Sequence, residues 1–433
     1  MKPEGYMPRV VDHEVEECLK TFGAIEIAGT KWCGKTWCAL KHGASVSYVD
    51  LQEEAIGEDP SLVLSGDRPH VIDEWQLVPR IWDYVRHEVD GTRGLHGGWI
   101  LTGSSTPRIR GKRALANAPH HSGAGRIGRI RMRPMSLFES GESTGQVSLR
   151  ALFEGRLDAC QVPHDVPGIV NAAIRGGWPE AIDLTPAAAQ RITAEYLDLL
   201  FTESVPDNGK SGETARRLVS SLARNLSQPV TYKTLITDMY GAEDDPERII
   251  TPPTVAEYLE VLERMFLVEG LRGWEPASRS KKRLVTKPKR YLADPSLVVS
   301  MLGMSYDSLL GDWQTFGLLF ESLCHRDLNV YAQVLPDAGR EPLRYYRDDT
   351  GLEVDFIIEL VDGRWAALEA KTGDKKVPGA IASLKRRHDK IVGDNSKACI
   401  RSPAFMGVLT ATSPYAREVE EDIYVIPIRS LAP

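Results

Sequence analysis

The sequence has few cysteines, no long apolar run and no excess of positive charge. Its six cysteines are scattered over 433 residues without a CxxC pair, a pattern typical of reduced thiols and not of a disulfide framework or a zinc site. No uncharged stretch reaches about 18 residues, and the N-terminus lacks the apolar core of a signal peptide. The net charge of −7 argues against a chain that coats nucleic acid through bulk attraction. We therefore expect a soluble, cytoplasmic protein without a membrane span.

A glycine-rich loop lies between a short apolar strand and a helix near the N-terminus. Residues 24–28 are mostly apolar, Gly29 to Thr36 match GxxxxGKT, and residues 37–42 can continue as a helix. In this setting the backbone N–H groups of the loop face the phosphates of ATP. Lys35 is expected to reach the β- and γ-phosphates, and the Thr36 hydroxyl to ligate Mg²⁺. The predicted nucleotide contacts are Gly29, Thr30, Lys31, Trp32, Cys33, Gly34, Lys35, Thr36 and Trp37.

An acidic pair, Asp73 and Glu74, ends an apolar strand about 40 residues after the loop. Asp73 is expected beside the magnesium ion, and Glu74 is expected to polarise the water that attacks the phosphate. The same two letters also fit a strand end followed by the start of a helix over 75–89. The loop upstream favours the catalytic interpretation.

Strands near 24–28, 46–50, 69–73 and 98–102, separated by helical segments, predict a parallel α/β sheet. The carboxyl ends of such strands meet at the ligand crevice, so Ser104 or Ser105 is placed to sense the γ-phosphate. A plain Gly-Ser turn explains these letters equally well.

Two basic segments stand out in a chain of negative net charge. Residues 108–133 contain eight Arg or Lys and no acid, and residues 279–290 contain seven. In the first segment Arg126 or Arg129 is a candidate finger that completes a neighbouring subunit's site, and a solvated or DNA-facing surface is the alternative. The second segment is expected to be an exposed wing or linker that contacts phosphate, or simply a solvated loop.

The middle of the chain is rich in helical patterns. Residues 139–210 predict a helical lid or connector, and apolar spacing predicts helices over 214–226, 232–239 and 252–262, followed by a strand from Phe266. This order is typical of a winged helix-turn-helix. Its third helix carries Glu257, Glu260 and Glu263, which repel phosphate, so a packing or oligomerisation module is an equal alternative.

Residues 353–371 alternate in the way of a two-stranded hairpin that turns at Asp362-Gly363. Burying both apolar rows on one face requires opposite residues whose numbers sum to an even value. In that register Asp355, Glu369 and Lys371 share the other face. Two carboxylates that hold Mg²⁺ and a lysine that helps activate water are the parts of a metal-dependent phosphodiester cutter, with Glu321 as a possible third acid. A solvated face with a salt bridge is the alternative.

The ordered set of motifs resembles a large prokaryotic family of AAA-like ATPases with a C-terminal domain of unknown function that has a restriction-endonuclease-like core. The matching segments are Gly29–Thr36, Val71–Glu74, Leu101–Ser105, Gly125-Arg126 with Arg133–Glu139, Gly176–Glu180, Thr254–Val268 and Glu353–Lys371. The resemblance implies ATP hydrolysis by Lys35, Thr36, Asp73 and Glu74. It also implies a nuclease-like set at Asp355, Glu369 and Lys371, and assembly into a ring or dimer.

These observations predict an α/β protein in four parts. They are a P-loop AAA-like ATPase domain (1–138), a helical lid or connector (139–210), a winged helix-turn-helix (211–275) and a restriction-endonuclease-like domain (276–433). The expected function is ATP and Mg²⁺ binding with ATP hydrolysis, coupled to DNA binding or cleavage. The alternative is a nucleotide-controlled switch or scaffold whose inactive nuclease-like domain binds a partner.

Overall fold

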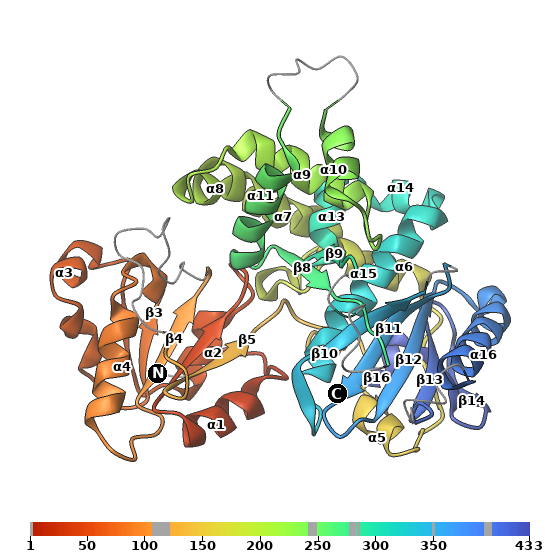
Figure 1. Cartoon of the computed structure of the whole chain (residues 1–433), viewed down its shortest axis with the longest axis horizontal. Helices are drawn as coiled ribbons and strands as arrows, with labels where there is room; N and C mark the ends of the chain where they lie inside the picture. The colour runs from red at the N-terminus through yellow and green to blue at the C-terminus, as the bar shows by residue number, and fades with distance from the viewer. Residues whose placement is uncertain are drawn as a thin grey trace. The chain divides into compact units, whose positions relative to one another are not determined.

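The computed structural model describes residues 3–105, 122–240, 249–276, 283, 286–348, 351–393 and 401–433. It divides into two compact units (Figure 1). Unit 1 comprises Met1–Pro134 with Leu262–Leu267, and unit 2 comprises Met135–Val261 with Val268–Pro433. The finer division into four domains stays a prediction. In the part of the chain that is described, no helix is both long and apolar enough to cross a membrane.

Unit 1 is built on a five-stranded sheet in the order β2-β3-β4-β1-β5, and all of its pairings are parallel. The four predicted strands are confirmed within two residues at each end, and β5 joins them. The strands are β1 (Ala24–Ala28), β2 (Ser45–Tyr48), β3 (His70–Asp73), β4 (Trp99–Gly103) and β5 (Ile127–Arg131). The helices are α1 (Asp12–Thr21), α2 (Lys35–His42), α3 (Glu53–Glu58), η1 (Pro60–Leu64), η2 (Trp75–Leu77) and α4 (Ile81–Gly91).

The strands of unit 1 are apolar on both sides because each face of the sheet supports its own core. Ile72 and Leu101 pack on one face with Trp82 of α4. Ile25 and Ile100 pack on the other, together with side chains of α1 and α2. A parallel sheet covered on both faces places its ligand site at the carboxyl ends of the strands.

Unit 2 opens with the helix-rich region that the sequence predicted. Its first elements are β6 (Val147–Ser148), α5 (Leu149–Phe153), β7 (Cys160–Gln161), α6 (Val166–Arg175), η3 (Pro179–Ala181), α7 (Pro186–Leu199), η4 (Leu200–Ser204) and α8 (Val205–Asp207). Then follow α9 (Gly212–Arg224), α10 (Tyr232–Met239), α11 (Pro252–Arg264), β8 (Val268–Leu271) and β9 (Lys289–Leu292). The pair β8–β9 is antiparallel. The order of α9 to β9 is compatible with a winged helix, and that assignment stays a prediction.

A seven-stranded mixed sheet forms the second half of unit 2, in the order β10-β11-β12-β13-β15-β14-β7. Helices α13 (Pro295–Leu302), α14 (Tyr306–Gly311) and α15 (Trp313–Ala332) precede it. Its later elements are β10 (Ala338–Arg347), β11 (Glu353–Leu360), β12 (Trp365–Lys371), η6 (Asp374–Lys376), α16 (Val377–Gly393), β13 (Phe405–Thr410), β14 (Tyr415–Glu420), β15 (Ile423–Pro427), η7 (Ile428–Ser430) and β16 (Leu431–Ala432).

The register of the hairpin β11–β12 is the one predicted from its apolar rows. Phe356 lies opposite Leu368 and Ile358 lies opposite Ala366, so the numbers sum to an even value. Contrary to the solvated-face alternative, the odd-numbered face is largely covered, since its apolar residues are buried and its charged residues are buried or partly buried. Ile357 on that face packs in one core with side chains of α16, which lies along β12 and β13 (Figure 1).

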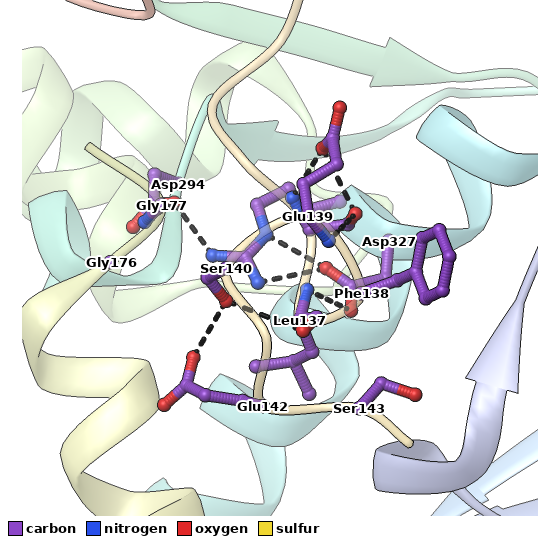
Figure 2. Close-up of polar contacts among 12 residues, drawn as sticks. Leu137, Phe138, Glu139, Ser140, Glu142, Ser143, Gly176, Gly177, Asp294 and Asp327 are labelled. Atoms are coloured by element: carbon purple, nitrogen blue, oxygen red, sulfur yellow. Dashed lines mark hydrogen bonds and ion pairs between the residues drawn. The ribbon is translucent and has the colours of Figure 1, made fainter. Parts of the chain in front are cut away.

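A buried ionic network holds the first segment of unit 2 against α15. Figure 2 shows the main chain of residues 137–143 beside Asp327 and Asp294. The Leu137 N–H donates to Asp327 at 3.0 Å, and the Gly177 N–H donates to Asp294 at 3.0 Å. Arg326 bonds both carboxylates, at 3.0 Å to Asp294 and 2.8 Å to Asp327. The two aspartates are fully buried, so this arginine supplies the charge that they need.

The same segment also meets the C-terminal residues of the chain. Strand β6 pairs in parallel with β16, where Val147 lies opposite Leu431. The Ser143 hydroxyl donates to the Leu431 carbonyl at 2.7 Å, and the Thr144 N–H donates to the Arg429 carbonyl at 2.7 Å. Residues 143–148 and 429–432, from opposite ends of the sequence of unit 2, are therefore joined by backbone and side-chain hydrogen bonds.

Candidate functional site

The predicted phosphate loop leaves β1 and enters α2, as the motif requires. Gly34 precedes α2 with φ of 96°, a left-handed conformation that glycine adopts without strain. A Cβ atom on Gly29 would lie 2.0 Å from the Met132 carbonyl oxygen on the neighbouring chain segment. Both glycines are therefore required by the backbone path of the loop.

Lys35 and Thr36 are the first two residues of α2, and both point into the loop region. The buried Lys35 ammonium donates to the Thr30 carbonyl at 2.9 Å, so it reaches back across the loop. The Thr36 hydroxyl donates to Asp73 Oδ1 at 2.9 Å. The fold thus brings the predicted pair Thr36 and Asp73 together from α2 and β3. A hydroxyl and a carboxylate in contact are oxygen ligands that suit Mg²⁺.

Asp73 and Glu74 differ in environment although they are adjacent. Asp73 is buried, which raises the pKa of its carboxyl group, and it accepts a hydrogen bond from Thr102 as well as from Thr36. Glu74 has φ of 55°, an uncommon conformation for a residue with a side chain. Its carboxylate accepts from the Ser104 hydroxyl at 3.1 Å. Such left-handed residues cluster at functional sites, where they aim a side chain.

Ser104 lies in this site as expected, and Gln76 joins it without having been predicted. The Gln76 side-chain amide donates to the Glu74 carboxylate and, at 3.2 Å, to the Ser104 hydroxyl. Glu74 is therefore held by two neutral donors. Such donors fix the position of the carboxylate.

Arg9 supports the phosphate loop through hydrogen bonds to its backbone. The sequence patterns did not indicate this role. Its guanidinium donates to the carbonyl of Cys33 at 2.6 Å and to that of Arg133 at 2.7 Å. The side chain is buried, and the two bonds join the loop to the segment after β5. Bonds from a charged donor are stronger than neutral ones, so Arg9 fixes the shape of the loop.

A group of polar side chains fastens α1 to α2. The Asp12 carboxylate accepts from the Tyr6 hydroxyl at 2.7 Å and lies 3.1 Å from His42 Nε2. The donor atoms of Asp12, Cys38 and His42 lie within 4.8 Å of one another, a grouping that sequence spacing did not indicate. Burial raises the pKa of Cys38 to about 12, so the thiol stays protonated at neutral pH. We interpret the group as a hydrogen-bonded support of the helix that carries Lys35.

The candidate finger Arg126 lies away from the phosphate loop of its own chain. It immediately precedes β5, and Ile127 pairs with Ala24 at the amino end of β1, whereas the loop follows the carboxyl end. Its guanidinium pairs with Asp90 at 2.7 Å. Arg126 is therefore not a nucleotide contact within this chain, and only a role in a neighbouring subunit's site stays open as a prediction. Arg129 pairs with the buried Glu26 at 3.3 Å.

The predicted nuclease-like residues converge in unit 2. Lys371 Nζ lies 2.5 Å from Glu369 Oε2 and 3.3 Å from Asp355 Oδ2. The Ala370 N–H donates to the same Asp355 oxygen at 2.9 Å. Both carboxylates therefore reach one cation from adjacent strands, β11 and β12. This arrangement fits the pair of acids that a magnesium site needs.

Burial and neighbouring charges make the acids of this site unequal. Burial raises the pKa of Glu369 to about 7, and the nearby Asp355 acts in the same direction. Burial also raises the pKa of Glu321 on α15 to about 7. Burial acts on Asp355 too, but Lys371 and Lys289 outweigh it and hold the pKa of Asp355 below its usual value. Acids with separated pKa values are typical of functional sites.

Two cations of this site were not predicted. Lys289 lies 3.0 Å from Glu321, 2.5 Å from Glu353 and 4.0 Å from Asp355. Arg387 on α16 forms an ion pair with Glu369. Sequence periodicity places residues on a face of their own strand or helix, and it does not show which distant strand or helix packs against that face.

The interpretation of residues 279–290 as an exposed basic loop is wrong for Arg283, Lys289 and Arg290, whereas Lys287 is exposed as expected. Lys289 and Arg290 are buried in β9, where Lys289 neutralises acids of the sheet. Arg283 pairs with Glu359 at 2.7 Å. Residues 279–282, 284 and 285 lie outside the described residues, as do 108–121 of the first basic segment.

Three parts of the sequence match known domain families. Residues 21–140 match the AAA domain. Residues 167–308 and 316–431 match two domains of unknown function, DUF8612 and DUF4143. No curated protein sequence matches the chain significantly.

Solved structures of low similarity were also found. A Walker-type ATPase of Pyrococcus abyssi is 14% identical, with 70% of this chain and 97% of the other covered and a TM-score of 0.43. The Orc1 protein of Aeropyrum pernix, solved in complex with DNA, is 13% identical, with 71% and 95% covered and a TM-score of 0.28. The AAA match and the geometry of Gly29–Thr36 identify the N-terminal part of the chain as an AAA-type P-loop ATPase domain.

Proposed function

We propose that this chain hydrolyses ATP at its P-loop and that its C-terminal domain has a restriction-endonuclease-like core that binds and cleaves DNA. The observation that supports the first part is the contact of Thr36 with Asp73, beside a Glu74 carboxylate held by Ser104. Thr36 and Asp73 would hold Mg²⁺, and Lys35 would hold the phosphates. Water then forms a bond to the γ-phosphorus, the bond to ADP breaks, and Glu74 accepts the water proton.

Two substitutions test the ATPase assignment. Lys35→Ala should abolish tight ATP binding, and Glu74→Gln should keep binding while slowing turnover, because the amide cannot accept a proton. Binding is measured with a fluorescent ATP analogue and turnover by phosphate release. Lys20→Ala, which changes an exposed lysine of α1, is the matched control. Normal hydrolysis by the Lys35 variant would refute the assignment.

The observation that supports the second part is the shared contact of Asp355 and Glu369 with one cation, Lys371. A divalent ion bound by these carboxylates would polarise the phosphodiester and acidify a bound water. Lys371 would stabilise the negative charge that grows on the phosphate oxygens. One P–O bond forms to water, one breaks to the sugar, and the water proton passes to the leaving oxygen.

Plasmid nicking in Mg²⁺ tests the cleavage step. Wild type should convert supercoiled to open-circular DNA, and Lys371→Ala should lose at least about 100-fold in rate, as expected when a charge-stabilising group is removed. Lys385→Ala is the control, since Lys385 is half-exposed and pairs with Glu420. Nicking that survives in Lys371→Ala would assign the activity to other residues.

The remaining parts of the proposal concern partners. The region around α9 to β9 would act as a winged helix or as an oligomer contact, and residues 108–133 would contact DNA or a neighbouring subunit. In a ring or dimer, Arg126 would leave Asp90 and reach the nucleotide of the next subunit. An Arg126→Ala variant that hydrolyses ATP normally when assembled would remove this role.

A second candidate function, a nucleotide-controlled switch with an inactive nuclease-like domain, is favoured by the cations of the acidic site. Four cations, Lys289, Arg347, Lys371 and Arg387, pair with the four carboxylates of Glu321, Glu353, Asp355 and Glu369. Such compensation can hold the fold without metal. Absence of nicking in every nucleotide state and with every oligomer would favour this alternative.

A further inference from the structure

The buried Lys289 has the surroundings of a bound metal ion. Its ammonium lies 2.5 Å from Glu353 and 3.0 Å from Glu321, and Asp355 Oδ1 lies at 4.0 Å. Only 1% of its side chain is exposed. Lysine is almost never fully buried unless it is paired, and here acidic oxygens from β11 and α15 surround one positive charge.

The partners of Lys289 come from a different part of the sequence. Lys289 lies in the region matched by DUF8612, whereas Glu321, Glu353 and Asp355 lie in that matched by DUF4143. The ammonium is therefore delivered to the acidic site by β9, from outside the hairpin and helix that carry the acids. Its position is set by the β8–β9 pair.

Asp355 stands between two cations. Its Oδ1 faces Lys289 at 4.0 Å, and its Oδ2 faces Lys371 at 3.3 Å. In sites with two metal ions, the ions lie about 3.5–4 Å apart and stabilise the attacking and leaving oxygens of the reaction. Asp355 here lies between two ammonium groups, one near each carboxylate oxygen, as a carboxylate that bridges two metal ions would.

The two lysines differ in their freedom to move. Lys371 is 26% exposed, so its flexible side chain can swing out and leave Asp355 and Glu369 to a divalent ion. Lys289 is enclosed, and its displacement would leave the largely buried Glu321 without a counter-charge, whereas Glu353 would keep Arg347 at 3.7 Å. Such an uncompensated charge is strongly unfavourable.

We propose that Lys289 permanently occupies one of the two cation positions beside Asp355, so that the acidic site takes a single divalent ion, held by Asp355 and Glu369. This inference rests on the metal-dependent cleavage proposed above. It assigns Lys289 as a positioning residue that supplies a fixed positive charge where a second ion would otherwise bind.

The number of bound Mn²⁺ ions tests the inference. Free and bound Mn²⁺ are separated by electron paramagnetic resonance on the full chain without nucleotide, in an Asp73→Asn background that silences the P-loop site. The Lys289-bearing chain should bind one ion, and Glu369→Gln should remove it. Lys289→Ala should bind two, whereas Lys289→Arg and the control Lys385→Ala should bind one.

The outcomes separate this inference from the proposed cleavage. Two ions in the Lys289-bearing chain would overturn the inference and leave metal-dependent cleavage intact. No ion in that chain would overturn both. A folded Lys289→Ala variant that still binds one ion would show that Lys289 is only a structural salt bridge. If Lys289→Ala does not fold, the number of Mn²⁺ ions bound by the Lys289-bearing chain and by Lys289→Arg still tests the inference. One bound ion supports it, and two bound ions refute it.

Discussion

Replacing Arg326 by methionine should destabilise unit 2 in a way that depends on pH. Arg326 is the cation between Asp294 and Asp327, and both carboxylates are fully buried. Asp294 would keep its donors from Gly177 and Ser296. Among the described residues, Asp327 would keep the Leu137 N–H at 3.0 Å and the longer Tyr331 bond at 3.4 Å. Both aspartates lose their counter-charge, and Asp327 is the one with fewer remaining donors.

The cost is limited by proton uptake at Asp327. Removing one partner of a buried pair costs about 3–5 kcal/mol. Burial already raises the pKa of Asp327 to about 6 although Arg326 opposes the shift, so without Arg326 the folded protein would hold this carboxyl protonated at pH 7. Protonating an aspartate of ordinary pKa costs about 4 kcal/mol at pH 7 and about 1.5 kcal/mol at pH 5. We expect a loss of up to about 4 kcal/mol at pH 7 and a smaller loss at pH 5, where Asp327 of the wild type is itself protonated.

The folded variant holds this proton throughout, whereas folded wild type, with a pKa of about 6 at Asp327, takes it up only as the pH falls, so the deficit shrinks mainly between pH 7 and pH 6. Urea unfolding at both pH values, followed by hydrogen exchange of residues 135–143, measures the loss locally, since a chain of two units need not unfold in one step. Arg216→Met, which breaks an exposed pair with Asp198, is the control and should cost at most about 1 kcal/mol. A loss below 1 kcal/mol at pH 7, or equal losses at both pH values, would refute the reasoning.

Three further predictions concern unit 1. His70 is buried, which lowers its pKa, so unit 1 should lose stability as the pH falls through about 6.5, where the unfolded chain takes up the proton first. His70→Gln should flatten this dependence in thermal unfolding between pH 7.5 and 5.5. Arg9→Leu removes two charged hydrogen bonds from the loop and should weaken ATP binding about 10-fold or more by titration, while an unchanged affinity would dismiss the support role. Gly29→Ala should lower the thermal midpoint of unit 1, because its Cβ would meet the Met132 carbonyl at 2.0 Å, and a wild-type midpoint would contradict that contact.

Sequence patterns predicted the parts of this molecule that are governed by local periodicity and by motifs. The alternation of residues 353–371 determined the hairpin register, and with it the convergence of Asp355 and Glu369, because a shift of one residue would expose the whole apolar row. The P-loop followed from the strand, the glycines and the helix around Lys35. In both cases the residues that act together are close in sequence or joined by one turn.

Contacts between distant segments could not be predicted in the same way. Lys289 was assigned to a solvated basic segment because its neighbours are basic, yet β9 carries it among acids of β11 and α15. Arg9 and Arg387 look like ordinary surface residues of their segments, and only packing shows their partners. A buried cation can be recognised only from the acids that it neutralises. For Lys289 and Arg387 those acids lie far away in the sequence.

The pairing of β6 with β16 has a consequence for the order of events during synthesis. Val147 lies opposite Leu431. This strand pair of unit 2 therefore joins a segment that is synthesised early to one that is synthesised nearly 300 residues later. Contacts so distant in sequence are slow to form, and domains tend to fold as units while the chain emerges. Residues 143–148 must therefore wait, unpaired, until 429–432 have been made. During that interval the short segment is exposed to chaperones and proteases, and substitutions there should lower the yield of folded protein more than its final stability.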